Sequence, residues 1–337
     1  MTLSHARVAR AIGGGGIHSL RFEPTAIEQP GPGEALLRLK AATLNYRDLL
    51  MIEGALSGLA KAPDYVPLSC GAGEVLAVGE GVTRVKMGDR VSPLFSLGWL
   101  DGMMPSVAML GGSADGVART HAIFPADSLV INPDSLGDLD AATLACAGLT
   151  AWNALFRDRE LKSSDLVLVQ GTGGVAIAAL QWAKAAGARV AVTSSSDAKL
   201  ARAKALGADL QINYRTHPDW PAQLRAINGG KGADVIVENV GQSGMAMAAS
   251  AIEPGGMISA VGRLDGGSGW DAQPLDGVQI ARITVGNRVQ HEAMLAFAAT
   301  HGIRPVVDAV YELERLGDAF RHVKSGQFFG KIAISLA

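Results

Sequence analysis

The residues best suited to bind a reactive cofactor form a glycine turn, Gly171-Thr172-Gly173-Gly174-Val175-Ala176. A short apolar run precedes the turn, and a stretch rich in Ala, Leu and Gln follows it, so the turn joins a buried strand to a helix. Such a turn lets the backbone approach a pyrophosphate, while the helix N-terminus offers unpaired N–H groups and a positive dipole end. A second strand at 189–193 completes a βαβ unit, and the turn therefore predicts a dinucleotide-binding site.

The elements that must position this turn alternate between strand and helix from about residue 136 onward. Strands are predicted at 166–170, 189–193, 210–213, 234–238 and 256–261, with helices after 174, at 197–206, near 220–227 and near 245–252. This alternation is typical of a doubly wound parallel sheet with helices on both faces. The first third instead shows short alternating strands at 35–41, 73–79 and 89–93, separated by Gly and Pro turns, which indicates a small β-rich domain.

Composition limits the class of protein. The 337 residues suggest about two domains, and the net charge of −2, with no Lys/Arg run, argues against nucleic acid as a partner. Two cysteines make no disulfide framework and fit a reducing compartment. Residues 1–17 lack the apolar core of a signal peptide, and the uncharged run 141–156 is short enough to be a buried helix rather than a membrane span. A cytoplasmic protein with no membrane partner is expected.

Several motifs in sequence order carry a resemblance to a known superfamily. They include Leu44-Asn45-Tyr46-Arg47-Asp48, Gly71-Ala72-Gly73-Glu74-Val75, Cys146-Ala147-Gly148-Leu149-Thr150, the glycine turn, and Phe329-Gly330-Lys331. The chain resembles the medium-chain dehydrogenase/reductase superfamily, in its zinc-independent, quinone-oxidoreductase-like or NAD(P)-dependent alcohol dehydrogenase branch.

The resemblance implies an α/β fold in which a Rossmann domain is inserted into a β-rich GroES-like catalytic domain. We expect the GroES-like domain over 1–135, the Rossmann domain over 136–267, and a return to the catalytic domain over 268–337. Ligands would bind outside the carboxyl ends of the strands. Relatives pair through an edge strand of the Rossmann domain, near 248–261, so a homodimer is also expected.

The resemblance also predicts that no metal is bound. Zinc-dependent relatives hold the ion with Cys, His and often a second Cys, beside an acidic residue. Here those positions carry Asn45, Cys70, Cys146 and Gly71, and Asn is a poor zinc ligand. The favoured interpretation makes both cysteines small buried hydrophobes; the alternative is a two-thiol remnant that catches adventitious metal or oxidises.

NADP(H) is the predicted cofactor, with NAD(H) as the alternative. NAD-preferring domains place an acid at the end of the second strand, but here that strand ends in Ser194-Ser195-Ser196. Lys199 and Tyr214 match positions that hold the 2′-phosphate in the quinone-oxidoreductase branch. Against this, Lys199 could be an ordinary solvated lysine and Asp197 could reach a ribose. The full predicted cofactor set is Thr150, Gly171, Thr172, Gly173, Gly174, Val175, Ser194, Ser195, Lys199, Tyr214, Asn239, Val240, Val261, Gly262, Val285, Gly286, Asn287 and Lys331.

The predicted catalytic groups are Asn45, Tyr46 and Asp48, since this segment lies against the nicotinamide in the family. Tyr46 either donates a proton to a substrate oxygen or serves as an aromatic wall, and Arg47 is expected in a structural ion pair. An apolar group, with members Phe95, Trp99, Met103 and Met104, predicts a roomy substrate pocket, with loop packing or a subunit contact as the alternative.

The implied function is NADPH-dependent, zinc-independent hydride transfer to a quinone or an α,β-unsaturated carbonyl. Such an electrophile needs no Lewis acid, because a hydrogen bond can stabilise its developing oxyanion. One alternative is a zinc-independent alcohol dehydrogenase or ketone reductase acting on an apolar substrate. A second alternative is a non-catalytic NADPH-binding protein.

Overall fold

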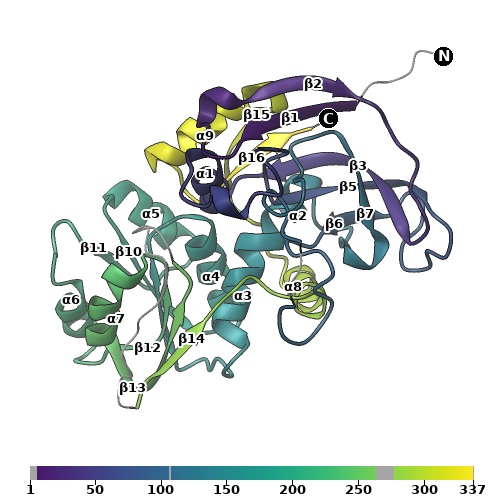
Figure 1. Ribbon diagram of the computed structural model, residues 1–337. Coiled ribbons are helices and arrows are strands. Elements are labelled where there is room, and N and C mark those ends of the chain that lie inside the picture. Colours follow the sequence, from purple (N-terminus) through teal and green to yellow (C-terminus); the bar gives the residue numbers. More distant parts are fainter. Residues whose placement is uncertain (1–5, 106–107, 263–276, 337) are drawn as a thin grey trace. The chain divides into compact units, whose positions relative to one another are not determined.

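The computed structural model describes residues 6–105, 108–262 and 277–336. The chain divides into two compact units, the first made of residues 1–149 with 286–337 and the second of residues 150–285. The first unit is therefore built from both ends of the chain, as Figure 1 shows by the purple and yellow segments that share it. This arrangement, a β-rich unit interrupted by a parallel α/β unit, confirms the predicted fold class.

The second unit is a six-stranded parallel sheet in the order β11-β10-β9-β12-β13-β14. Its strands are β9 (Leu166–Gln170), β10 (Arg189–Ser194), β11 (Leu210–Asn213), β12 (Ala233–Glu238), β13 (Ile252–Ala260) and β14 (Gln279–Arg282). Its helices are α3 (Leu149–Phe156), α4 (Gly174–Ala185), α5 (Asp197–Ala205), α6 (Trp220–Ile227) and α7 (Met245–Ala251). Helices α4 and α5 pack on β9–β11, while α6 packs against α7 on the other face (Figure 1). The strand order reverses between β9 and β12, where doubly wound sheets bind their ligands.

The first unit contains a larger mixed sheet in the order β15-β16-β3-β5-β6-β8, with β7 also paired to β3, and a three-stranded sheet, β2-β1-β4. The strands are β1 (Ala6–Ile12), β2 (Arg21–Thr25), β3 (Glu34–Thr43), β4 (Asp64–Tyr65), β5 (Cys70–Val78), β6 (Arg90–Pro93), β7 (His121–Pro125), β8 (Leu129–Ile131), β15 (Val307–Glu312) and β16 (Lys331–Ser335). The helices are α1 (Tyr46–Glu53), α2 (Asp138–Thr143), α8 (Arg288–Thr300) and α9 (Leu316–Ser325). Because β16 pairs antiparallel with β3, the last strand lies beside residues 41–43.

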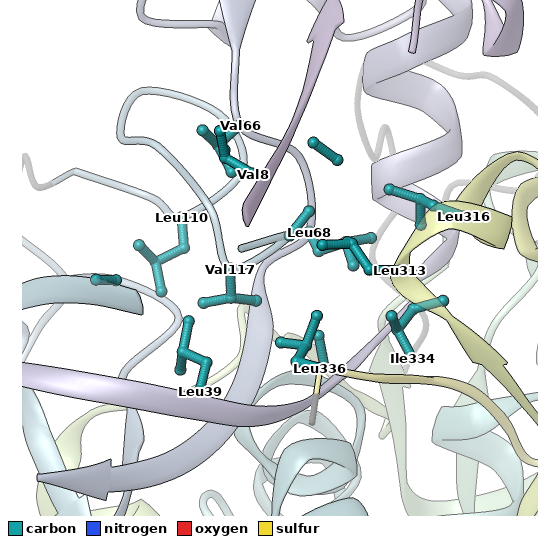
Figure 2. Packing of buried hydrophobic residues seen from close by; sticks show 14 of the residues in the cluster. Val8, Leu39, Val66, Leu68, Leu110, Val117, Leu313, Leu316, Ile334 and Leu336 are labelled. Carbon is teal, nitrogen blue, oxygen red and sulfur yellow. The ribbon is translucent and has the colours of Figure 1, made fainter. Parts of the chain in front are cut away.

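The hydrophobic core of the first unit joins residues that are far apart in the sequence. Figure 2 shows Val8 and Leu39 from the N-terminal strands packed in one cluster with Leu68, Leu316 and Ile334. Apolar side chains that leave water here stabilise the unit by about 25 cal/mol per Å² of buried surface. The cluster therefore fixes the C-terminal strand and α9 against the N-terminal sheets.

The unit boundaries fall later in the chain than the predicted domain limits. Residues 138–148 form α2 and a π-helical turn, and α2 packs on β3 and β5 of the first unit rather than on the Rossmann sheet. The predicted limit at 267/268 lies outside the described residues.

The predicted edge strand needs a correction. Residues 252–260 form β13, which pairs with β12 on one side and with β14 on the other, from Met257↔Gln279 to Ala260↔Arg282. Within the described residues the edge strand on this side of the sheet is therefore β14, and β11 forms the opposite edge. The sequence analysis assigned no strand after residue 261 to this sheet, so β14 was not recognised as part of it.

Among the described residues, one helical stretch, Asp138–Phe156, is long and apolar enough to cross a membrane by length and composition alone. Of its apolar 18-residue window, 72% is buried inside the protein, as in the core helix of a globular protein. The predicted buried helix at 141–156 corresponds to this stretch.

Candidate functional site

The glycine turn of the second unit connects β9 to α4. Gly171 has φ +83°, a left-handed conformation in which any side chain would be strained, and its N–H donates to the carbonyl of Thr193 on β10 at 2.9 Å. Gly173 is the N-cap of α4, and a Cβ placed there would meet nothing within 4 Å. The backbone is thus open beside the first-turn N–H groups of α4, which have no intrahelical partners. This open cradle fits the pyrophosphate of a nicotinamide dinucleotide.

The end of β10 carries hydroxyl groups and no acid. Ser196 caps α5 by accepting the N–H of Lys199 at 3.4 Å, and the hydroxyl of Ser194 accepts the N–H of Ser196 at 3.3 Å. Asp197 receives a hydrogen bond from the Asn213 amide at 2.7 Å, so its carboxylate already has a partner within the unit. Tyr214 is exposed at the end of β11.

The end of β12 is organised by a residue that the sequence reasoning missed. Glu238 is fully buried, and its carboxylate accepts the N–H groups of Val240 and Gly241 at 2.9 and 3.0 Å. The Asn239 amide donates to the carbonyl of Gln170 at 3.0 Å. Because the N–H of Val240, a predicted cofactor residue, and the N–H of Gly241 already donate to Glu238, cofactor contacts here would come from other atoms of this loop. The sequence signal that could have identified Glu238 is an acidic residue at the end of an otherwise apolar strand.

The backbone is closely packed just after β13 and strained just after β14. A Cβ on Gly262 would collide with the backbone of Asn239, so only glycine lets β13 end so near β12. Val285 has φ +38°, an outlier for a β-branched residue, and its carbonyl accepts from the Asn153 amide at 2.5 Å. Thr150 is buried on α3 of the same unit.

Predicted cofactor residues also fall in the first unit. Gly286 is its first residue after the inserted unit, and Asn287 caps α8, accepting the N–H of Gln290 at 2.9 Å. Asn287 therefore has a structural role in holding the start of that helix.

Lys331 lies at the centre of a buried polar cluster in the first unit. Its side chain is 6% exposed, and its Nζ donates to Asn45 Oδ1 at 2.6 Å and to the carbonyl of Leu44. The Asn45 amide in turn donates to Cys70 Sγ and to Ser69 Oγ, each at 3.1 Å. Every polar atom of the Asn45 side chain thus has a partner.

The same cluster contains two thiols and a carboxylate. Cys70 and Cys146 share a side-chain hydrogen bond, and both interact electrostatically with Lys331. The hydroxyl of Ser69 donates to Asp48 Oδ1 at 3.1 Å, and the Asn45 N–H donates to Asp48 Oδ2 at 2.8 Å. We name these residues, Asn45, Asp48, Ser69, Cys70, Cys146 and Lys331, the lysine–thiol cluster.

Burial and neighbouring charges shift the pKa values of Cys70 and Lys331 in opposite directions. Burial raises the pKa of the Cys70 thiol, but the hydrogen bond with Cys146 and the charge of Lys331 outweigh it, so the pKa lies below its ordinary value. The hydrogen bond with Cys70, together with burial, raises the pKa of Cys146. Burial lowers the pKa of Lys331, against the attraction of the two sulfurs and Asp48. Cys70 is therefore the more acidic sulfur of the pair, and both sulfurs interact with the Lys331 amine.

Local structure holds the two thiols in place. Cys70 starts β5 directly after a loop in which Leu68 has φ +69°, and the N–H of Val117 holds that loop by donating to the Leu68 carbonyl at 2.9 Å. Cys146 lies in a π-helical turn over Leu144–Gly148. Strained backbone and π-turns are both enriched at functional sites.

Arg47 has the structural role that was expected. Its guanidinium lies 3.4 Å from Asp48, donates to the carbonyl of Leu110 at 2.9 Å, and lies over the Phe95 ring at 4.9 Å.

The other predicted residues of this unit are not all brought together. Tyr46, the first residue of α1, is 40% exposed. Phe95 and Trp99 are buried, and the Trp99 indole donates to the carbonyl of Gly102 at 3.0 Å. Met103, in contrast, is 92% exposed and Met104 is also exposed. The four apolar residues therefore divide into two packed and two solvent-facing side chains, and their role as a substrate pocket stays a prediction.

Comparison with known proteins agrees with this geometry. Residues 31–134 match the alcohol dehydrogenase GroES-like domain, and residues 174–310 match the zinc-binding dehydrogenase family. A zinc-type alcohol dehydrogenase-like protein of Schizosaccharomyces pombe is 38% identical over 94% of this chain and 95% of its own length. The chain belongs to the medium-chain dehydrogenase/reductase superfamily. It is an oxidoreductase of that type.

Two solved structures of the superfamily are close in fold. A candidate alcohol dehydrogenase from Sinorhizobium meliloti superposes with a TM-score of 0.91 at 38% identity, covering 99% of this chain and all of the other. An NAD-dependent alcohol dehydrogenase superposes with a TM-score of 0.88 at 32% identity, covering 98% of this chain and all of the other.

The zinc implied by these family names does not fit the lysine–thiol cluster. Zinc is held by four tetrahedral donors drawn from Cys, His, Asp and Glu, or by three and a water. Among the described residues no group of three or more such side chains could hold a metal ion. An acid at Gly71 would also be crowded, because a Cβ there would lie 3.1 Å from Val117 and 3.2 Å from the Ala41 carbonyl oxygen.

Proposed function

We propose that this member of the superfamily is an NADPH-dependent, zinc-independent reductase of a quinone or an α,β-unsaturated carbonyl compound. One observation carries the proposal: the place of the metal ligands is taken by a lysine ammonium, an amide and two thiols. Without a Lewis acid, an isolated carbonyl or alcohol is a difficult substrate. A conjugated acceptor instead spreads the negative charge that hydride addition creates, and a hydrogen bond suffices to stabilise it.

The second unit would hold the cofactor. Bound NADPH supplies a hydride, and the protein supplies orientation and electrostatics. The open backbone at Gly173 and the N-terminus of α4 would bind the pyrophosphate. The hydroxyls of Ser194 and Ser195, with Lys199 and Tyr214, would hold the 2′-phosphate.

Support for NADP(H) over NAD(H) comes from Asp197. An acid that accepts from the ribose 2′-hydroxyl would repel a 2′-phosphate. Here the Asp197 carboxylate accepts from Asn213 instead. The NAD-dependent relative is the reason to test both cofactors.

The first unit would hold the acceptor. The exposed phenol of Tyr46 would donate to the acceptor oxygen, next to Asn45 and Asp48 in the chain. We propose a small apolar carbonyl compound or quinone as the substrate, a homodimer as the assembly, and the cytoplasm as the location, with no nucleic acid or membrane partner.

A panel of acceptors tests the proposal. Quinones, enones and simple ketones are offered with NADPH and with NADH, before and after treatment with a chelator. We expect quinone or enone reduction with NADPH that the chelator leaves unchanged. A clear NADH preference contradicts the cofactor assignment, and activity that the chelator abolishes contradicts zinc independence.

A second candidate function is a zinc-independent alcohol dehydrogenase or ketone reductase. It is favoured by the relatives, which carry alcohol dehydrogenase names. That reaction needs an acid to protonate an alkoxide, and Tyr46 is the candidate. Reduction of simple ketones in the same panel, at rates above those of quinones and enones, would select this function.

A further inference from the structure

The lysine–thiol cluster contains its own positive charge. Lys331 reaches it from β16, and its Nζ donates to Asn45 Oδ1 at 2.6 Å and to the Leu44 carbonyl. An ammonium carries three N–H donors and no acceptor, so it is not a metal ligand. The side chain is nearly closed off from water, and charge effects are therefore poorly screened.

Lys331 also fixes the neighbouring donors. Its bond to Asn45 Oδ1 points the amide nitrogen of Asn45 toward Cys70 Sγ, 3.1 Å away, and toward Ser69 Oγ. Cys146 completes the group through its hydrogen bond with Cys70. The cluster therefore contains two sulfurs, one amide and one ammonium. A divalent metal would need at least one more Cys, His, Asp or Glu ligand beside the two sulfurs.

We propose that Lys331 is the resident cation of this cluster: its ammonium, held on the Asn45 side chain that also contacts Cys70, keeps divalent metal out. This inference deepens the zinc independence of the proposed function and does not depend on the electron acceptor. Metal is excluded by the charge of Lys331 and not merely by the missing third ligand at Asn45. Lys331 is a positioning residue here, acting through Asn45 and the two sulfurs.

Cobalt(II) is the probe, because cobalt bound by thiolates gives an intense charge-transfer absorption that needs no nicotinamide and no acceptor. Four full-length proteins are titrated with cobalt(II) chloride under reducing conditions: the unaltered chain, Asn45→Cys, Lys331→Met, and Asn45→Cys combined with Lys331→Met. Asn45→Cys supplies a third sulfur while keeping the charge, and the double variant supplies the sulfur and removes the charge.

We expect no charge-transfer band at one equivalent for the unaltered chain or for Asn45→Cys. The double variant should bind about one equivalent, on the order of 100-fold more tightly than Asn45→Cys, because a unit charge in contact with a divalent ion no longer opposes it. Lys184→Met, which removes a partly exposed lysine paired with Asp209 in the second unit, is the matched control and should not change cobalt binding.

Three results would overturn the inference. They are a stoichiometric band in the unaltered chain, equal affinities for Asn45→Cys and the double variant, and no band in a folded double variant. Thermal unfolding by circular dichroism shows which variants fold, and Lys331→Gln replaces Lys331→Met if the latter does not. Since the readout is metal binding, a negative acceptor panel leaves this inference intact, and a failure here leaves the cofactor assignment intact.

Discussion

At the scale of single residues, Asn45 is the predicted catalytic group whose surroundings are most informative. Its oxygen accepts from Lys331 and its amide donates to Ser69 and Cys70. Both N–H groups of the amide are therefore used within the lysine–thiol cluster, and any further hydrogen bond that Asn45 donates would require it to give up one of these. Tyr46, by contrast, follows it in the chain and is exposed.

Replacing Tyr46 separates the two candidate reactions. In Tyr46→Phe we expect quinone reduction to fall less than about fivefold, since a conjugated oxyanion needs little proton donation, and ketone reduction to fall by about 100-fold or more. Steady-state kcat/KM values for both acceptors measure this. Tyr311→Phe, which alters a phenol bonded to His322, is the control. Equal losses for both acceptors would assign Tyr46 a merely structural role.

Lys199 provides a test of cofactor choice. Lys199→Ala should raise the KM for NADPH by at least about tenfold, because a charge-assisted contact to a 2′-phosphate is worth about 1.5–3 kcal/mol, and should leave the KM for NADH unchanged. Lys204→Ala, on the same helix, is the matched control. A parallel rise for both cofactors would show that Lys199 acts on the helix and not on the phosphate.

At the scale of elements, the β9–α4 turn separates two roles of glycine. Gly171→Ala places a side chain at φ +83° and should lower the free energy of unfolding by about 1–2 kcal/mol. Gly173→Ala meets no protein atom within 4 Å, so its stability should not change. Its methyl group would instead stand in the cradle and weaken NADPH binding at least about tenfold.

Urea unfolding and calorimetric titration with NADPH measure the two effects on the same proteins. If Gly173→Ala binds NADPH as tightly as the unaltered chain, the pyrophosphate does not lie against Gly173.

The elements that could be predicted from sequence are those with a strong period. Strands such as Leu166–Gln170 and helices such as Trp220–Ile227 were placed within a residue or two, because buried parallel strands and amphipathic helices differ clearly in pattern. Helix α1 was not predicted, and the π-turn around Cys146 was not distinguished from the helix expected over 141–156, because one wider turn inside an apolar helix leaves the run of apolar residues unchanged. Strand β14 has only four residues and was missed as an edge of the sheet.

At the scale of the whole molecule, the lysine–thiol cluster shows what sequence reasoning could not supply. Lys331 was predicted to reach the cofactor, and the structure places its ammonium on Asn45, 286 positions earlier in the chain. Only the antiparallel pairing of β16 with β3 brings these residues together. The Cys70–Cys146 contact depends on the same long-range packing. The replacement of a zinc ligand by Asn45, and of the neighbouring acidic residue by Gly71, was visible in the sequence.

His291 predicts a pH dependence of stability. It is fully buried on α8, neither ring nitrogen has a hydrogen-bond partner, and burial lowers its pKa to about 4. The unfolded chain binds a proton near pH 6.5 and the folded chain only near pH 4, so stability is complete above pH 6.5 and is lost as pH falls toward 4. The free energy of unfolding should fall by about 3 kcal/mol in total, because each unit of pKa difference between the folded and unfolded chain corresponds to about 1.4 kcal/mol.

Urea unfolding at pH 7 and pH 4.5 checks the sign and the size of this effect. His291→Leu should remove most of the difference between the two pH values, whereas His301→Gln, exposed at the end of α8, should not. An unchanged difference in His291→Leu would mean that other groups cause the acid sensitivity.

The proposed function requires hydride transfer without a metal, and one preparation allows metal content and turnover to be measured together. Zinc is determined by elemental analysis, before and after exhaustive chelation, on the same sample whose NADPH-dependent quinone or enone reduction is followed. We predict far less than one zinc per chain and full activity throughout. Close to one zinc per chain, with activity that chelation removes and zinc restores, would contradict hydride transfer without a metal.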